Sequence, residues 1–156
     1  MTATLAPRAG WQLDEACAQS YEAVLVPALL GPWAEDLVDA VGVRPGQRVV
    51  DVGTGTGAVA RAAARRIGDA GEVTGFDINP HMLTIARRVS AGSVPAIRYD
   101  VAAADAPPLP DGAADAVLCQ QALQFVPDPS AALAELHRVC APGGRIGVRT
   151  CRSLEH

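Results

Sequence analysis

Residues 49–60, VVDVGTGTGAVA, contain the strongest structural signal in the chain. With the preceding arginine they form RVVDV at 48–52, a short apolar run typical of a buried β-strand. Three glycines follow, and residues 58–67 then place apolar side chains four apart, as a helix does. A glycine-rich turn between a strand and a helix lets the backbone approach a ligand closely, and the amides of the helix N-terminus favour acceptor groups. The segment therefore predicts a nucleotide-binding loop.

Two carboxylates lie where the predicted strands end. Asp51 comes two positions before Gly53, and Asp77 closes a second strand, EVTGFD at 72–77. The carboxyl ends of neighbouring parallel strands frame one crevice, so we expect both carboxylates beside the glycine loop. Asp77 is placed to accept hydrogen bonds from both hydroxyls of a ribose. That role fits NAD and S-adenosylmethionine equally well.

Asp51 favours one of these two cofactors. A carboxylate beside the glycine turn would repel the pyrophosphate of a dinucleotide, and the chain has no lysine to compensate, since all 13 basic residues are arginine. S-adenosylmethionine has no phosphate and carries an ammonium and a sulfonium, so an acidic group attracts it, directly or through water. An NAD(P)-dependent reductase is further disfavoured because no Tyr-Lys pair or histidine is placed for hydride transfer.

Strands and helices alternate along the rest of the chain. We expect further strands at 96–101, 113–119 and 145–150, and further helices at 80–90 and from Asp128 onward. Five strands alternating with helices imply an α/β fold, a doubly wound parallel sheet with helices on both faces.

The N-terminal section has a helical pattern instead. Apolar residues recur at helical spacing over 14–41, and Pro27 and the Gly31-Pro32 pair predict breaks that divide the section into two or three pieces. We therefore expect two parts: a tail and helical cap over residues 1–42, and a cofactor-binding domain over residues 43–156.

The chain resembles the class I S-adenosylmethionine-dependent methyltransferases, and the resemblance extends beyond the glycine loop. FDINPHML at 76–83 is similar to the family's second motif, and AADAPPLPDGAADAV at 103–117 is similar to its third. CQQALQFVPDP at 119–129 resembles the segment after the fourth strand, and LHRVCAPGGRIGV at 136–148 resembles the following helix and fifth strand. The similarity covers about residues 40–152, and its pattern is that of the small-molecule methyltransferases akin to the ubiquinone/menaquinone type.

The resemblance implies a set of cofactor contacts. Asp77 would bind the ribose, and Ile78 and Met82 would flank the adenine. Asp105 would accept from the adenine amino group, and Ala106 would donate its backbone amide to the ring. The predicted cofactor-binding residues are Asp51, Gly53, Thr54, Gly55, Gly57, Asp77, Ile78, Met82, Asp105, Ala106 and Gln120. Methyl transfer depends on alignment more than on one universal group, so no catalytic residue is named, and no metal site is expected.

Other side chains near these motifs have two interpretations. Gln120 and Gln121 either line the methyl-transfer cleft or cap the short helix that follows. Trp11, Tyr21 and Phe125 are expected to pack against apolar neighbours rather than to touch a ligand.

The resemblance also implies a Rossmann-like sheet in the order 3-2-1-4-5 that lacks the last strands of the family. Family members continue past the fifth strand with a helix and an antiparallel strand pair, whereas this sequence ends at His156. Leu154-Glu155-His156 is either native or the scar of a histidine tag. The fifth strand would then be an unpaired sheet edge, which favours association with another chain. We expect a truncated or partial chain that either forms a homodimer through this edge or is only marginally stable.

Composition excludes several classes of function. The formal net charge of −4 makes the chain a poor generic partner for nucleic acid, and no apolar run reaches the roughly 18 residues of a membrane span. The four cysteines form no CxxC pair, which favours free thiols in a reducing cytoplasm. We expect a cytoplasmic S-adenosylmethionine-dependent methyltransferase that acts on a small-molecule acceptor and releases S-adenosylhomocysteine. The alternative is a non-catalytic S-adenosylmethionine-binding fragment or adaptor that assembles through its open sheet edge.

Overall fold

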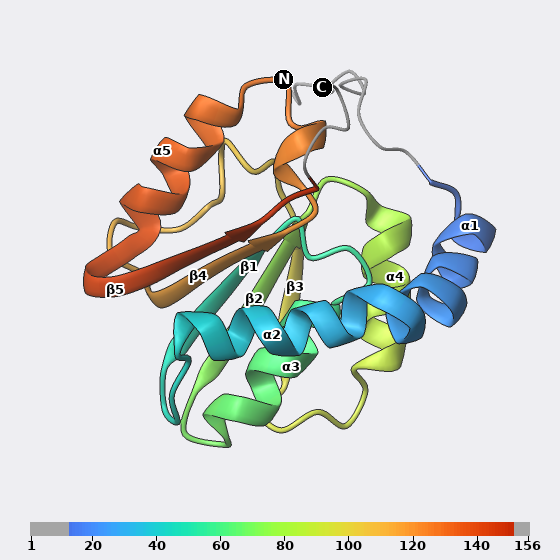
Figure 1. The fold of residues 1–156 in the computed structure, drawn as a ribbon, viewed down its shortest axis with the longest axis horizontal. Helices are drawn as coiled ribbons and strands as arrows, with labels where there is room; N and C mark the ends of the chain where they lie inside the picture. Colours follow the sequence, from blue (N-terminus) through green and yellow to red (C-terminus); the bar gives the residue numbers. More distant parts are fainter. Residues whose placement is uncertain (1–12, 152–156) are drawn as a thin grey trace, which may run out of the picture.

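A five-stranded parallel sheet forms the centre of the molecule (Figure 1). The computed structural model describes residues 13–151. The strands are β1 (Arg48–Val52), β2 (Glu72–Asp77), β3 (Ile97–Val101), β4 (Ala114–Gln120) and β5 (Cys140–Arg149). They pair in the order β3-β2-β1-β4-β5, and every pair is parallel. The predicted Rossmann-like topology is confirmed.

Helices cover both faces of the sheet (Figure 1). Helices α2, α3 and α4 contribute to the apolar core on one face, and α5 packs on the other. The helical elements are α1 (Glu15–Ser20), η1 (Tyr21–Leu30), α2 (Gly31–Val41), α3 (Ala58–Ile67), α4 (Pro80–Val89), η2 (Leu123–Phe125) and α5 (Pro129–Val139). Short Ala and Val side chains dominate both cores, which lets the helices approach the sheet closely.

Strand β1 shows how the alternation of a strand places the first carboxylate. Val49 joins the core on the α3 side, whereas Val50 and Val52 join the core on the α5 side. Because successive side chains point to opposite faces, Asp51 shares the α3 face with Val49. Its neighbour in space is the first turn of α3, where it accepts a hydrogen bond from the amide of Ala60.

The prediction that the N-terminal helical section breaks at Pro27 is wrong, whereas at the predicted Gly31-Pro32 position η1 gives way to α2, which has Pro32 in its first turn. α1, η1 and α2 follow one another without a gap, and η1 is a π-helix that contains Pro27. The amide of Gly31 bonds to the carbonyl of Val26, five residues back, so the helix widens around the proline instead of ending there. Such wide turns occur often at functional sites. Trp11 and the first twelve residues of the predicted cap lie outside the described residues.

Strand β5 begins five residues earlier than predicted. The structure starts it at Cys140, directly after α5, with Gly143 in a left-handed conformation and an irregularity in register between Ala114 and Ala116 of β4. Within residues 13–151, β5 pairs with β4 on one side and with no strand on the other. Residues 154–156, whose origin the sequence leaves open, fall outside the described part.

Candidate functional site

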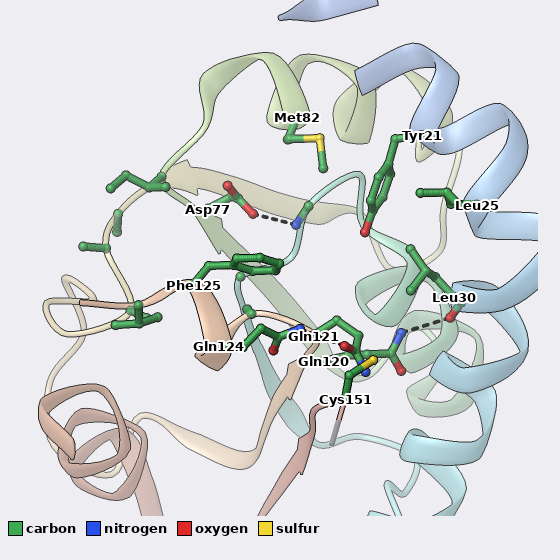
Figure 2. Close-up of a pocket in the computed structure, with 18 of the residues that line it drawn as sticks. Tyr21, Leu25, Leu30, Asp77, Met82, Gln120, Gln121, Gln124, Phe125 and Cys151 are labelled. Carbon is green, nitrogen blue, oxygen red and sulfur yellow. Dashed lines mark hydrogen bonds between the residues drawn. The ribbon is translucent and has the colours of Figure 1, made fainter. Parts of the chain in front are cut away.

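A cavity of about 360 Å³ opens at the carboxyl ends of the strands. The walls come from η1 and α2, the glycine loop, the end of β2, the loop after β3 and the segment after β4 (Figure 2). The lining residues are Tyr21, Leu25, Leu29, Leu30, Trp33, Gly53, Gly55, Asp77, Ile78, Met82, Ala102, Ala103, Ala104, Asp105, Gln120, Gln121, Ala122, Gln124, Phe125, Val126, Pro127 and Cys151. Seven of the eleven predicted cofactor residues are in this set: Gly53, Gly55, Asp77, Ile78, Met82, Asp105 and Gln120.

Of the two carboxylates at the ends of β1 and β2, Asp77 is the one that lines the cavity. Its Oδ2 accepts the amide of Gly55 at 2.8 Å (Figure 2), and its Oδ1 accepts the amide of Asn79 at 2.9 Å. Burial raises the pKa of Asp77, and these backbone donors oppose that shift. Each carboxylate oxygen can accept more than one hydrogen bond, so both retain capacity for a pair of ligand hydroxyls.

Asp51 lies behind the glycine loop and does not line the cavity. It is 1% exposed, and its Oδ2 accepts from Thr54 Oγ1 at 2.6 Å and from the amide of Ala60 at 3.1 Å. The second oxygen, Oδ1, is buried and has no hydrogen-bond partner among the described residues. Neither Asp51 nor Thr54 lines the cavity, and the hydroxyl of Thr54 is directed to Asp51, so their contact with a cofactor stays a prediction. Both residues instead hold the glycine loop against the start of α3.

Because Asp51 is buried, we expect the free energy of unfolding to depend on pH. Burial raises the pKa of Asp51 from 3.8 to about 7, which hydrogen bonds from Thr54 and Ala60 only partly oppose. Between those pH values the unfolded chain loses this proton and the folded chain keeps it, so stability falls as pH rises from about 4 to 7, by on the order of 4 kcal/mol. Asp51→Asn keeps an acceptor for both donors but cannot titrate. Urea denaturation at pH 4.5 and pH 8 should show the free energy of unfolding of wild type falling relative to this variant. An unchanged difference at the two pH values would contradict the assignment.

The loop at Gly53 requires glycine because another segment approaches it. Gly53 has φ +70°, and a Cβ built there would lie 2.3 Å from the Cβ of Ala122, which follows β4. The backbone of the glycine loop is thus open to the cavity on one side and in close contact with the β4 end on the other. Gly57, the N-cap of α3, does not line the cavity, because its α-carbon is covered by Tyr99.

Three of the four residues predicted to contact the adenine line the cavity. Ile78, Met82 and Asp105 line one wall of the cavity with the alanines at 102–104. Ala106 does not: it is exposed, and its amide donates to the carbonyl of Ala103 at 3.1 Å. The turn itself uses the Ala106 amide, so the structure does not place this donor at the cavity, and its contact with the adenine stays a prediction.

Three glutamines form the polar part of the opposite wall. Gln120 Nε2 donates to the carbonyl of Leu30 at 3.0 Å and so ties the end of β4 to η1 (Figure 2). Gln124 Nε2 donates to Gln121 Oε1 at 2.8 Å. Gln121 is the one non-glycine residue of the described chain with positive φ, at 54°. All three glutamines line the cavity, and no side chain caps η2, so of the two interpretations the structure agrees with the one that places them at the cleft.

Two cavity residues had been assigned to packing from the sequence. The hydroxyl of Tyr21 points towards the glycine loop, and the ring of Phe125 extends into the cavity below Asp77 (Figure 2). Phe125 is 45% exposed, which a core residue would not be. Burial, followed by the charge of Asp77, raises the pKa of Tyr21 to about 12, so its hydroxyl stays protonated. One feature of the sequence could have indicated that Tyr21 lies at a ligand site: it stands just before residues 23–34, a largely apolar run without charges.

The cavity contains no basic side chain among its lining residues. Its charged groups are carboxylates, so the described walls suit a ligand that is cationic or neutral and would repel a pyrophosphate. Within residues 13–151, no group of three His, Cys, Asp or Glu side chains is arranged to hold a metal ion. The helices of that part are also too short or too polar to cross a membrane.

Comparison with known proteins gives matches over most of the described chain. A protein-family model described as "Methyltransferase domain" matches residues 50–148. The ubiquinone/menaquinone biosynthesis C-methyltransferase UbiE of Teredinibacter turnerae is 39% identical over 116 residues, which is 73% of this chain and 47% of that protein. The chain thus spans about half the length of the curated relatives it matches.

Solved structures share the fold. A SAM-dependent methyltransferase from Aquifex aeolicus superimposes with a TM-score of 0.71 at 23% identity, covering 83% of this chain and 69% of the other. The [4+2]-cyclase SpnF superimposes with a TM-score of 0.69 at 26% identity, covering 86% and 58%. The same architecture is therefore found in proteins described by different reactions.

Proposed function

The chain belongs to the methyltransferase domain family of class I S-adenosylmethionine-dependent enzymes, and from this premise we propose that it transfers a methyl group from S-adenosylmethionine to a small organic acceptor. The observation that carries the proposal is the cavity itself. Asp77 and the glycine loop face it at the carboxyl ends of the strands, and no basic side chain lines it. That arrangement fits a cofactor with a ribose and a sulfonium but no phosphate.

The cofactor would extend across the carboxyl ends of the strands. The two oxygens of Asp77 would accept the ribose hydroxyls while keeping the backbone donors of Gly55 and Asn79. Ile78 and Met82 would pack on the adenine, with Asp105 at its edge. Because Gly53 and Gly55 have no side chain, their backbone can approach the methionine end closely.

When bound, S-adenosylmethionine supplies an electrophilic methyl group on a positively charged sulfur. The residues of the chain position the acceptor and keep water away from the reacting atoms. The acceptor part of the cavity is mostly apolar, with Leu25, Leu29, Trp33 and Phe125 in its walls. Its polar groups there are mainly the carboxamides at 120, 121 and 124, which can orient a hydroxyl or carbonyl by hydrogen bonds.

We propose that the acceptor is an uncharged, largely apolar molecule with a hydroxyl or carbonyl group, such as a phenol or a hydroquinone. The lining of the cavity supports this class. The names of the curated relatives, C-methyltransferases of ubiquinone and menaquinone biosynthesis, support methylation at carbon. The homodimer predicted from the open β5 edge stays a prediction.

A methyl-transfer assay tests the proposed function. The protein is incubated with S-adenosylmethionine carrying a labelled methyl group and with a panel of phenols, hydroquinones, amines and carboxylic acids. We expect label in a product extracted into organic solvent for at least one phenol or hydroquinone. Binding of S-adenosylmethionine without transfer to any acceptor would favour the non-catalytic alternative, and transfer confined to amines would contradict the proposed acceptor class.

A further inference from the structure

One guanidinium connects two segments that line the cavity. Arg61, in the first turns of α3, donates through Nη2 to Glu22 Oε1 of η1 at 2.8 Å. Through Nη1 it donates to the carbonyl oxygen of Thr56 in the glycine loop at 2.7 Å. The side chains of Arg61 and Glu22 are only 16% and 18% exposed, which makes theirs the most buried ion pair of the described chain. Arginine suits this bridge because its planar fork can hold two acceptors at once.

Each partner of Arg61 is next in sequence to a cavity residue. Glu22 follows Tyr21, and Thr56 follows Gly55. Tyr21 and Gly55 both line the cavity and lie close together: a Cβ built on Gly55 would be 3.8 Å from the Tyr21 hydroxyl oxygen. Arg61 holds Glu22 and Thr56, and their sequence neighbours Tyr21 and Gly55 form part of the cavity wall. Arg61 therefore joins η1 to the glycine loop by hydrogen bonds.

The surroundings of this bridge indicate a geometric role rather than a stabilising one. Glu22 Oε2 and Thr56 Oγ1 are buried and have no hydrogen-bond partner among the described residues. A buried ion pair adds little net stability, because loss of hydration offsets the attraction, but it restrains the groups that it joins. Two buried polar atoms beside the bridge thus lack partners, which argues against a purely stabilising role for it.

A second ion pair on α3 provides a comparison within the same molecule. Arg65, one turn further along α3, pairs with Glu35 of α2. Both side chains are exposed, at 62% and 47%, and neither lines the cavity. This pair joins α3 to the same N-terminal helical section but touches no part of the glycine loop. Loss of the Arg65 pair therefore reports the effect of joining the helices alone, and loss of the Arg61 pair adds the effect of the contact with the glycine loop.

We propose that Arg61 is a positioning residue for cofactor binding, which holds Tyr21 over the glycine loop through its paired contacts to Glu22 and Thr56. The inference rests on the proposed function, because it assumes that S-adenosylmethionine binds against the wall that Tyr21 and Gly55 form. Arg61 itself does not line the cavity and acts through Tyr21 and the loop.

The test compares Arg61→Met with Arg65→Met, using S-adenosylhomocysteine as the probe in isothermal titration calorimetry. Both changes keep most of the aliphatic stem and remove one guanidinium. We expect Arg61→Met to raise the dissociation constant about tenfold, a typical size for coupling between two parts of a site. Arg65→Met should bind like wild type. Glu22→Gln, which keeps an acceptor for Arg61 but removes the charge, should show a smaller loss, and circular dichroism confirms that each variant is folded.

A double substitution tests whether Arg61 acts through Tyr21. If it does, Arg61→Met should weaken binding much less in a Tyr21→Ala background than in wild type, since coupled residues are not additive. Fully additive effects, or wild-type affinity in Arg61→Met, would overturn the inference. If Arg61→Met fails to fold, wild-type affinity in Glu22→Gln overturns it instead. If the wild-type protein does not bind S-adenosylhomocysteine, the proposed function fails. That result differs from every outcome that overturns the role of Arg61, because each of those requires binding by the wild-type protein.

Discussion

Asp77→Ala is expected to weaken binding of S-adenosylhomocysteine by about a hundredfold or more. The substitution removes the proposed acceptor of the ribose hydroxyls and also the acceptor of the Gly55 amide in the glycine loop. A hydrogen bond to a charged group contributes about 1.5–3 kcal/mol, so the loss of two at the ribose corresponds to at least about 3 kcal/mol, or roughly a hundredfold in affinity.

The variant should nevertheless fold. Burial raises the pKa of Asp77, which means that the folded protein holds this carboxylate at some energetic cost. Titration calorimetry measures the affinity, and Asp115→Asn is the control. Asp115 lies at the opposite end of the sheet and does not line the cavity. Its Oδ1 pairs with Arg48 Nη2 at 2.7 Å. A dissociation constant for Asp77→Ala within threefold of wild type would contradict the assignment of this residue.

Gly57→Ala is expected to destabilise the protein strongly, because it adds a methyl group where the backbone conformation and the packing both oppose one. Gly57 has φ +86°, a conformation that costs an L-residue about 1–2 kcal/mol. A Cβ there would also lie 2.3 Å from the hydroxyl oxygen of Tyr99, which is buried and hydrogen-bonded to Ser90 at 2.8 Å. Overpacking of this kind adds about 1–3 kcal/mol. We therefore expect a total loss of about 2–5 kcal/mol in the free energy of unfolding, measured by urea denaturation.

Gly46→Ala is the matched control for this substitution. Gly46 has a similar φ of +79°, but a Cβ built there meets nothing within 4 Å. The control should lose only the conformational part, about 1–2 kcal/mol. The difference between the two variants isolates the contact with Tyr99. Equal losses in both variants would show that Tyr99 moves aside and that close packing does not hold the loop.

The parts of the fold that follow local rules were predictable from the sequence. The strand, glycine loop and helix at 48–67 follow from spacing alone, because each element is short and its residues are neighbours. The sheet order came from the resemblance to a family and is confirmed by the strand pairing. Pro27 was misjudged because the local rule assumes an α-helix, whereas the chain widens into a π-helix packed on the rest of the molecule.

The candidate site was predictable only where it follows the strand ends. Asp77 ends a strand and therefore faces the crevice, whereas Asp51, one strand away, points to the helix side and is sealed off by Thr54. The contribution of the N-terminal section could not be read from sequence. Glu22 and Arg61 are 39 positions apart, and they meet only because the N-terminal helical section folds back on the sheet domain, where its α2 packs against α3. Tyr21 becomes a cavity residue for the same reason.

The central claim is that the cavity at the carboxyl ends of the strands holds S-adenosylmethionine and not a dinucleotide. Titration of the purified protein with S-adenosylhomocysteine and, separately, with NADH tests it most directly. We predict saturable binding of S-adenosylhomocysteine with one site per chain and no heat of binding with NADH, because the lining offers carboxylates and no cation for a pyrophosphate. Binding of NADH in preference to S-adenosylhomocysteine, or no binding of S-adenosylhomocysteine by the folded protein, would contradict the account.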